Sequence, residues 1–142
     1  MDTAINQSFE HNILMRSIKI MDIVFIYTLS VLFAFYVAIF LDTYVFHETD
    51  EKAEEKKSYL RNLFEICVVI GIIGVVSYIG RNIIELIPFP FDGYKGYSHA
   101  KVKELKSGGM LNVFLLMFST AFVLRTTALK EKILHKKIVI YE

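Results

Sequence analysis

The chain has little of what enzymes and disulfide-stabilised domains depend on. It contains a single cysteine, Cys67, so an internal disulfide is excluded, and this thiol lies in an apolar run as a small hydrophobic residue. The four histidines are far apart and none has the spacing of a metal ligand pair. A glycine-rich phosphate loop and a serine nucleophile motif are also missing. We therefore expect no enzyme activity, no cofactor and no metal site.

Charge of one sign is also lacking, since the formal net charge is only +1. This balance gives no general attraction to nucleic acid, and we expect no nucleic-acid partner. Of the 142 residues, 54% are hydrophobic and 22% are charged, which is close to the composition of soluble domains. The clustering of the hydrophobic residues is therefore more informative than their number.

Three long runs carry no charged residue: 23–41, 66–80 and 107–124. A helix rises 1.5 Å per residue, so the first run spans about 28 Å of a hydrocarbon core that is about 30 Å thick. The second run is short for a full span, although flanking apolar residues extend it; a re-entrant segment is the alternative. The first run is too long for a signal peptide and no cleavage pattern precedes it.

These runs predict an all-α integral membrane protein with three transmembrane helices and an ordered Pro/Gly-rich connector. We expect one membrane domain, 1–142, whose parts are listed here in chain order: transmembrane helices at about 20–42, 63–86 and 108–126, a charged loop or helix at 43–62, a connector at 87–107 and a basic tail at 127–142. Thr49 or Asp50 is a candidate helix cap in the charged segment. The tail is expected to lie along anionic headgroups, to add a strand to a partner, or to fray.

Small residues recur at helical spacing in the first two spans. Ser30, Ala34 and Ala38 repeat every four residues, and a second series repeats every three residues: Gly71, Gly74, Ser77 and Gly80. Because helices in lipid associate through close packing, both series predict packing faces. Chance recurrence is the alternative for the first series and a hinge for the second. If the second series packs, Gly74→Leu disrupts the bundle.

The second span ends in polar residues. Arg81 and Glu85 are one turn apart and are predicted to form an ion pair at the membrane edge. An ionisable residue at this depth indicates a functional site. The alternative is that Arg81 simply reaches the lipid headgroups by extending its side chain.

The connector contains both prolines of the chain. Pro88 and Pro90 predict extended backbone, and the helix before them must end by Ile87. Asp92-Gly93 indicates a turn, and Gly96 a second break. Ser98 is a candidate N-cap for a short helix, 99–106.

Membrane orientation does not follow from the basic residues. One face would carry two Lys or Arg residues before the first span and five in the second loop, 2 + 5 = 7. The other would carry four in the first loop and five in the tail, 4 + 5 = 9. The positive-inside rule requires a clear excess, so the topology stays open.

Residues 81–109 resemble a connector found in small membrane proteins of large icosahedral double-stranded DNA viruses, the minor capsid and inner-membrane proteins of nucleocytoplasmic large DNA viruses. The residues that carry this resemblance are Pro88, Pro90, Asp92, Gly93, Gly96, Tyr97 and His99. It implies a structural virion protein that tethers the internal lipid bilayer to the capsid shell and assists assembly. The implied partners are the bilayer, other minor capsid or membrane proteins, and further copies of the chain. The expected contact surfaces are the connector, 86–109, and the charged segment, 42–65, on opposite sides of the bilayer.

The same resemblance implies a location in the internal membrane of the virion, and in membrane derived from the endoplasmic reticulum during assembly. Two other functions remain open from the sequence. One is a small oligomeric channel or holin-like pore lined by Arg81. The other is an accessory subunit of a cellular membrane complex.

Overall fold

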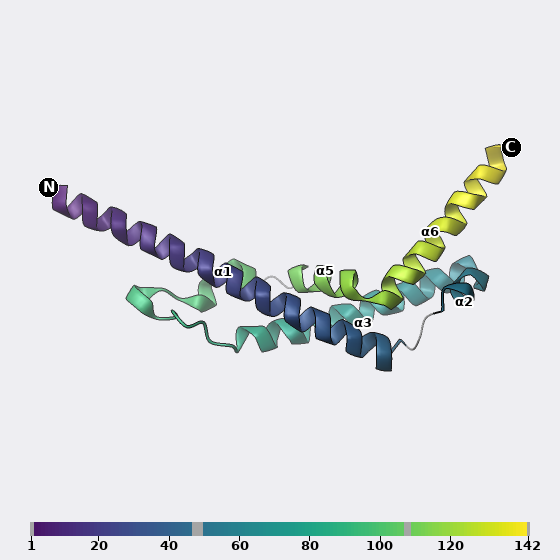
Figure 1. Ribbon diagram of the computed structural model, residues 1–142, viewed down its shortest axis with the longest axis horizontal. Helices are drawn as coiled ribbons and strands as arrows, with labels where there is room; N and C mark the ends of the chain where they lie inside the picture. The colour runs from purple at the N-terminus through teal and green to yellow at the C-terminus, as the bar shows by residue number, and fades with distance from the viewer. Residues whose placement is uncertain (1, 47–49, 107–108, 142) are drawn as a thin grey trace.

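The protein is an elongated bundle of helices. The computed structural model describes residues 2–46, 50–106 and 109–141. Its longest elements are α1 (Asp2–Tyr44) and α3 (Tyr59–Glu85), and α1 runs along most of the length of the molecule. In Figure 1 the two termini lie at opposite ends. No strand occurs in the described part of the chain, so the all-α prediction is confirmed.

Shorter elements complete the bundle. A six-residue helix, α2 (Glu51–Lys56), precedes α3, and its N-cap is Asp50, whose carboxylate accepts a hydrogen bond from the Lys52 N–H. Thr49, the other candidate cap, lies outside the described residues. After α3, residues 86–102 form a loop with two 3₁₀ turns, η1 (Tyr94–Gly96) and η2 (His99–Lys101). The chain ends with α4 (Lys103–Lys106), α5 (Gly109–Phe118) and α6 (Thr120–Tyr141).

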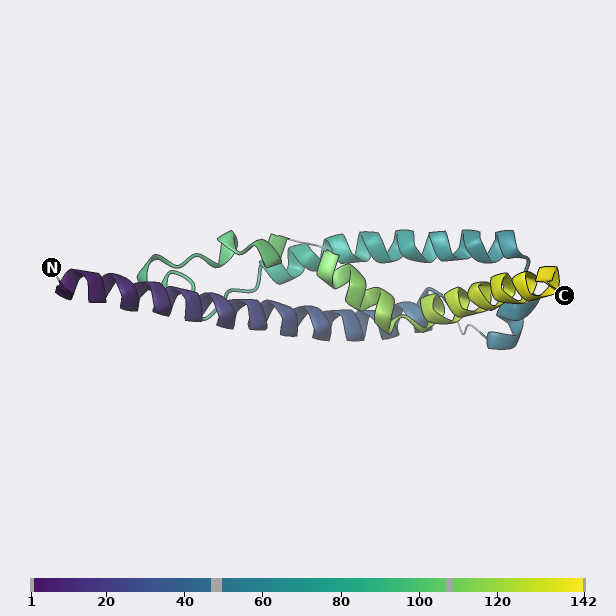
Figure 2. The same cartoon turned by 90° about the horizontal axis from the view of Figure 1, so that it is seen from above.

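The core is a narrow seam between α1, α3 and α5. Figure 2 shows α5 lying between the two long helices, and it contacts both. On α3 the buried residues recur every three or four positions, as one face of a helix must. They are Asn62, Ile66, Val69, Ile73, Ser77, Gly80 and Ile84. Their partners on α1 and α5 include Ala34, Ala38, Leu111 and Leu115.

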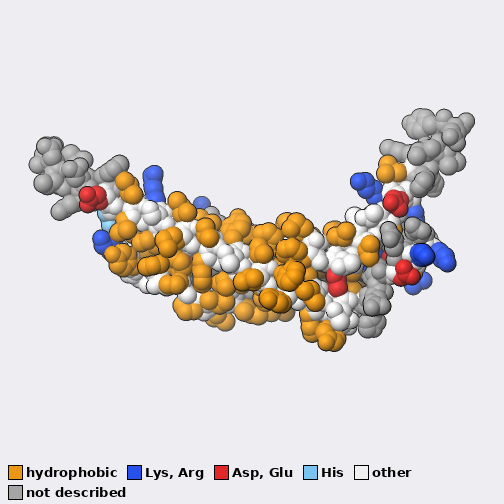
Figure 3. Space-filling model, in the orientation of Figure 1, with side chains coloured by type: hydrophobic (Ala, Val, Ile, Leu, Met, Phe, Trp, Pro, Cys, Tyr) orange, Lys and Arg blue, Asp and Glu red, His pale blue; other side chains and the backbone are white. Residues whose placement is uncertain are grey.

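Apolar side chains also cover the outside of the bundle. Figure 3 shows hydrophobic side chains over the middle of the molecule, with acidic and basic groups gathered toward its two ends. Phe64 is 69% exposed and Tyr36 68%. Exposed apolar surface on this scale is unusual for a soluble monomer and is expected where lipid covers it.

Two helices are long and apolar enough to cross a membrane: the Glu10–Tyr44 part of α1, and α3. A third crossing results only if α5 and the first part of α6, to Leu134, count as one bent span. The described residues therefore include two, or up to three, candidate membrane-spanning helices, which is compatible with a membrane protein.

The third apolar run differs from its sequence prediction. We expected one straight helix over 108–126, but the helix breaks at Ser119 and α6 leaves α5 at 74°. The predicted tail is not a separate segment either, because α6 continues through it to Tyr141. The residues around Ser119 include no proline or glycine, so the sequence did not reveal this break. A carboxylate on α1, described below, stabilises the start of α6 there.

The short helix predicted at 99–106 is also divided. A 3₁₀ turn covers His99–Lys101, Val102 has extended backbone (φ −71°, ψ 123°), and α4 begins one residue later. The Ser98 side chain makes no capping hydrogen bond. The side chain that accepts from the His99 N–H is Asp92, at 2.8 Å.

Candidate functional site

A buried carboxylate on α1 holds the loop that follows α3. Asp22 is 0% exposed although it lies in a long apolar helix. Its Oδ2 accepts a hydrogen bond from the Tyr97 hydroxyl at 2.7 Å, and its Oδ1 lies 2.7 Å from Nδ1 of His99. Partners 75 and 77 residues away in sequence thus meet on one side chain. We call Asp22, Tyr97 and His99 the Asp22 cluster.

Backbone geometry turns the loop so that both rings reach Asp22. Gly93 and Gly96 have φ values of 82° and 83°, a left-handed conformation that favours glycine, and Lys95 between them has φ 47°. The Gly93 N–H donates to the Tyr97 carbonyl at 2.9 Å, which closes the turn. Asp92 then fixes the start of η2 through the His99 N–H.

Aromatic rings enclose the imidazole of His99. The Phe89 ring stacks on it at 5.8 Å between centroids, and Phe25 meets its edge at 6.5 Å. With a hydrogen on Nδ1, the imidazole donates to the Asp22 carboxylate. The other nitrogen, Nε2, is buried and has no hydrogen-bond partner in the described part of the chain.

This geometry revises the role predicted for the connector residues. Tyr97 and His99 were expected to contact a partner, but both side chains are buried against α1. The other five residues named for that role are exposed at the surface of the loop: Pro88, Pro90, Asp92, Gly93 and Gly96. Any partner contact therefore belongs to these residues and to their neighbours, not to the two rings.

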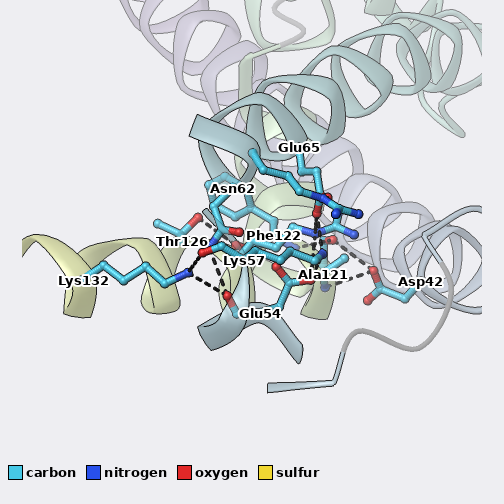
Figure 4. A network of polar contacts seen from close by, with 12 residues as sticks. Asp42, Glu54, Lys57, Asn62, Glu65, Ala121, Phe122, Thr126 and Lys132 are labelled. Carbon is cyan, nitrogen blue, oxygen red and sulfur yellow. Dashed lines mark hydrogen bonds and ion pairs between the residues drawn. The ribbon is translucent and has the colours of Figure 1, made fainter. Parts of the chain in front are cut away.

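A second polar network lies where α2, α3 and α6 meet (Figure 4). Lys57 Nζ is 2.6 Å from Glu54 on α2 and 2.6 Å from Glu65 on α3. Arg125 of α6 lies 3.5 Å from both carboxylates, and Lys132 donates to the Glu54 and Lys57 carbonyls. We call this the α2 network. It uses two charges of the segment 43–62, those of Glu54 and Lys57, within the chain, whereas Asp50, Lys52 and Lys56 are exposed.

Removing the lysine at the centre of the α2 network is expected to loosen α2. Glu54 is only 2% exposed, so Lys57→Met leaves a buried carboxylate without its closest cation. The cost is about 1–3 kcal/mol. Hydrogen exchange over 51–57 should rise and the detergent-solubilised protein should unfold at lower temperature. The neighbouring Lys56→Met removes the same charge from an exposed side chain, and an equal effect there would contradict the assignment.

Asp42 explains the break between α5 and α6. Its Oδ2 accepts from the Thr120 N–H at 2.6 Å, and its Oδ1 accepts from the Ala121 N–H and from the Ser119 hydroxyl. The Ser119 oxygen also accepts from the Phe122 N–H. The first N–H groups of a helix need such acceptors, and a carboxylate there also suits the helix dipole. A side chain from α1 therefore stabilises the start of α6.

Loss of this cap is expected to unwind the first turn of α6. Asp42→Ala removes both backbone contacts at a cost of about 0.5–2 kcal/mol. Hydrogen exchange at 120–123 should rise, with little change at 60–80. Asp42→Asn retains one acceptor oxygen, so its hydrogen exchange at 120–123 should lie between that of the unaltered chain and that of Asp42→Ala. If exchange at 120–123 is unchanged in the alanine variant, the cap does not hold the bend.

The predicted Arg81–Glu85 ion pair is absent from the contacts of the described residues. The Arg81 guanidinium instead lies over the Tyr78 ring, 5.3 Å from its centroid. It donates to the Lys106 carbonyl at 3.3 Å and to Asn82 Oδ1 at 3.1 Å. Glu85 is exposed. Arg81 therefore contacts the end of α4 and not Glu85. The spacing of residues within one helix cannot predict a contact with another helix.

The two predicted packing series have different outcomes. Ser30, Ala34 and Ala38 are all buried. In the second series Ser77 and Gly80 are buried, and the Ser77 hydroxyl donates to Asn112 on α5 at 3.1 Å. Gly71 and Gly74 have open space where a Cβ would lie. The prediction that Gly74→Leu disrupts packing within the chain is therefore wrong. Gly80 is the position in this series where a larger side chain would clash.

The side chains that organise the molecule were not predicted from the sequence: Asp22 and Asp42 flank the uncharged run 23–41, and Ser119 lies within the run 107–124. The available signal was that Asp22 and Asp42 stand at the two ends of one uncharged run, where a helix would enter and leave a bilayer. No group of three or more potential metal ligands occurs within the described residues.

Taken together, the described residues form a helical bundle with two, or up to three, candidate membrane-spanning helices, a loop held by a carboxylate, and an ion-pair network. Comparisons with protein-family models, with curated proteins and with solved structures gave no match. The argument for function therefore depends on the chain itself.

Proposed function

We propose that the chain is a structural membrane protein that presents the loop at 86–102 in a fixed position relative to a bilayer. The observation that carries this proposal is the Asp22 cluster, because it anchors the loop to a candidate membrane helix through two buried hydrogen bonds. A loop held in this way has lost most of its conformational freedom before any partner arrives, which lowers the entropic cost of binding.

The proposed role is to tether the internal bilayer of a large icosahedral virion to its capsid shell and to assist assembly. The resemblance of residues 81–109 to connectors in such proteins supports it, together with exposed connector residues such as Pro88, Pro90 and Gly96. The three-span topology and the connector role belong to this proposal. So does the absence of enzyme activity.

Chemical cross-linking with mass spectrometry on intact particles or native membrane tests the tether. The lysines at 95–106 should link to proteins of the capsid layer. In an Asp22→Ala particle these links should fall, whereas links from Lys52 and Lys56 should persist. Links only between copies of the chain would overturn the tether in favour of a pore, which ion flux through liposomes would then measure. Links to subunits of a host membrane complex would favour an accessory role.

A further inference from the structure

The two polar ends of the molecule differ in whether their Lys and Arg side chains form ion pairs. In the α2 network the cations face carboxylates: Lys57 and Arg125 both lie against Glu54 and Glu65. At the other end, no ion pair in the described part of the chain involves Arg81, Lys103 or Lys106. Among the described side chains, these cations therefore have no internal anion of the kind that the α2 network provides.

The three cations come from two segments that are in contact, the end of α3 and α4. Arg81 reaches the carbonyl of Lys106 there. Lys103 and Lys106 are three residues apart in α4, so their side chains leave the same side of this short helix. Both lysines are exposed.

Arg81 also has hydrogen-bonding capacity that the chain does not use. A guanidinium carries five N–H donors in a planar fork that matches phosphate oxygens. Within the described residues Arg81 donates to two acceptors, both longer than 3.0 Å, and its Nε is buried without one. Nη1 and Nη2 each carry a second N–H beside the one used in these hydrogen bonds, and an anion there would supply an acceptor.

The position of the cluster indicates which anion it meets. Arg81 lies one turn before the end of α3, a candidate membrane span. Beside it are exposed apolar groups, Tyr78, Ile79 and Ile83, and Leu86 just beyond is 82% exposed. Tyrosine, arginine and lysine at the end of an apolar helix mark the level of lipid headgroups. An acyl chain would lie on the apolar groups while the phosphate meets the cations.

We propose that Arg81, Lys103 and Lys106 form a binding site for the phosphate headgroup of an anionic lipid. This site would hold the start of the loop at 86–102 at the level of the lipid headgroups. The proposed tether does not depend on such a site. Loss of capsid cross-links would leave this site unaffected, and loss of lipid binding would leave those cross-links in place. The two proposals therefore fail independently.

Lipid titration of the full chain in detergent, read by native mass spectrometry, tests the site. Phosphatidylglycerol is compared with phosphatidylcholine of the same acyl chains. Each cation at a membrane surface changes binding by about fivefold. We expect R81Q/K103Q/K106Q to bind phosphatidylglycerol at least tenfold more weakly than the unaltered chain, with phosphatidylcholine unchanged. The control K52Q/K56Q/K130Q removes the same charge from exposed lysines elsewhere and should change binding less than twofold.

Further variants cover the case in which the triple variant does not fold. K103Q/K106Q leaves the contacts of Arg81 in place and should still lose several-fold affinity. R81K keeps the charge but not the fork, and should bind more weakly than the unaltered chain. Equal losses in the triple variant and its control, no preference for phosphatidylglycerol, or full competition by inorganic phosphate would each overturn the lipid site. Retention of a co-purified acidic protein in place of lipid would overturn it as well.

Discussion

Replacing Asp22 with alanine is expected to release residues 86–102 from α1 while the α2 network stays intact. The variant removes the carboxylate that lies 2.7 Å from the Tyr97 hydroxyl and 2.7 Å from the His99 ring nitrogen, both on buried side chains. Each hydrogen bond to a charged group contributes about 1.5–3 kcal/mol, so losing both is enough to undock a loop. Hydrogen exchange at 89–102 should rise strongly, and exchange at 51–66 should not change.

Two variants show whether the carboxylate itself is responsible. Tyr97→Phe removes one donor and leaves no unpaired group on the loop, so its effect should be much smaller than that of Asp22→Ala. Asp92→Ala removes a single contact, from an exposed position, to the His99 N–H. If hydrogen exchange at 89–102 rises no more in Asp22→Ala than in these two variants, the Asp22 cluster does not anchor the loop.

Gly80→Leu is expected to be the most damaging change in α3. A Cβ at this position would clash with Phe33 of α1, whose Cζ lies 2.8 Å away, and with Leu111 of α5, also at 2.8 Å. Three helices therefore meet at one glycine. Overpacking of this kind costs about 1–3 kcal/mol, and a leucine adds more volume than the seam can take up. Thermal unfolding in detergent should shift to clearly lower temperature.

Gly74→Leu in the same helix is the matched control. A Cβ there has nothing within 4 Å, so the purified chain should unfold close to the temperature of the unaltered protein. Both variants exchange a helical glycine for leucine, so differences in helix propensity cancel. Equal destabilisation by the two would show that the close contact at Gly80 is not what limits packing.

The long apolar runs predicted the helices because burial in lipid requires every backbone group to bond within its own segment. Spacing within one helix also located the buried residues Ser30, Ala34 and Ala38. It could not separate Gly80 from Gly74, because a small residue permits a close approach without specifying a partner. That distinction depends on Phe33 and Leu111, which are distant in sequence.

The polar contacts were the least predictable feature. Arg81 was assigned to Glu85, its neighbour on the helix, but lies against Lys106 because the loop brings α4 back to α3. Similarly, the bend at Ser119 depends on Asp42, 77 residues earlier. Contacts between residues so far apart in sequence depend on the path of the whole chain, so no local sequence pattern predicts them.

Asp22 and Asp42 are 20 residues apart on one helix, which places them about 30 Å apart along the axis and about 200° apart around it. The loop and the start of α6 are therefore attached to nearly opposite sides of α1. Because both are attached to one continuous helix, a tilt of α1 about its middle would displace the loop and the start of α6 in opposite directions.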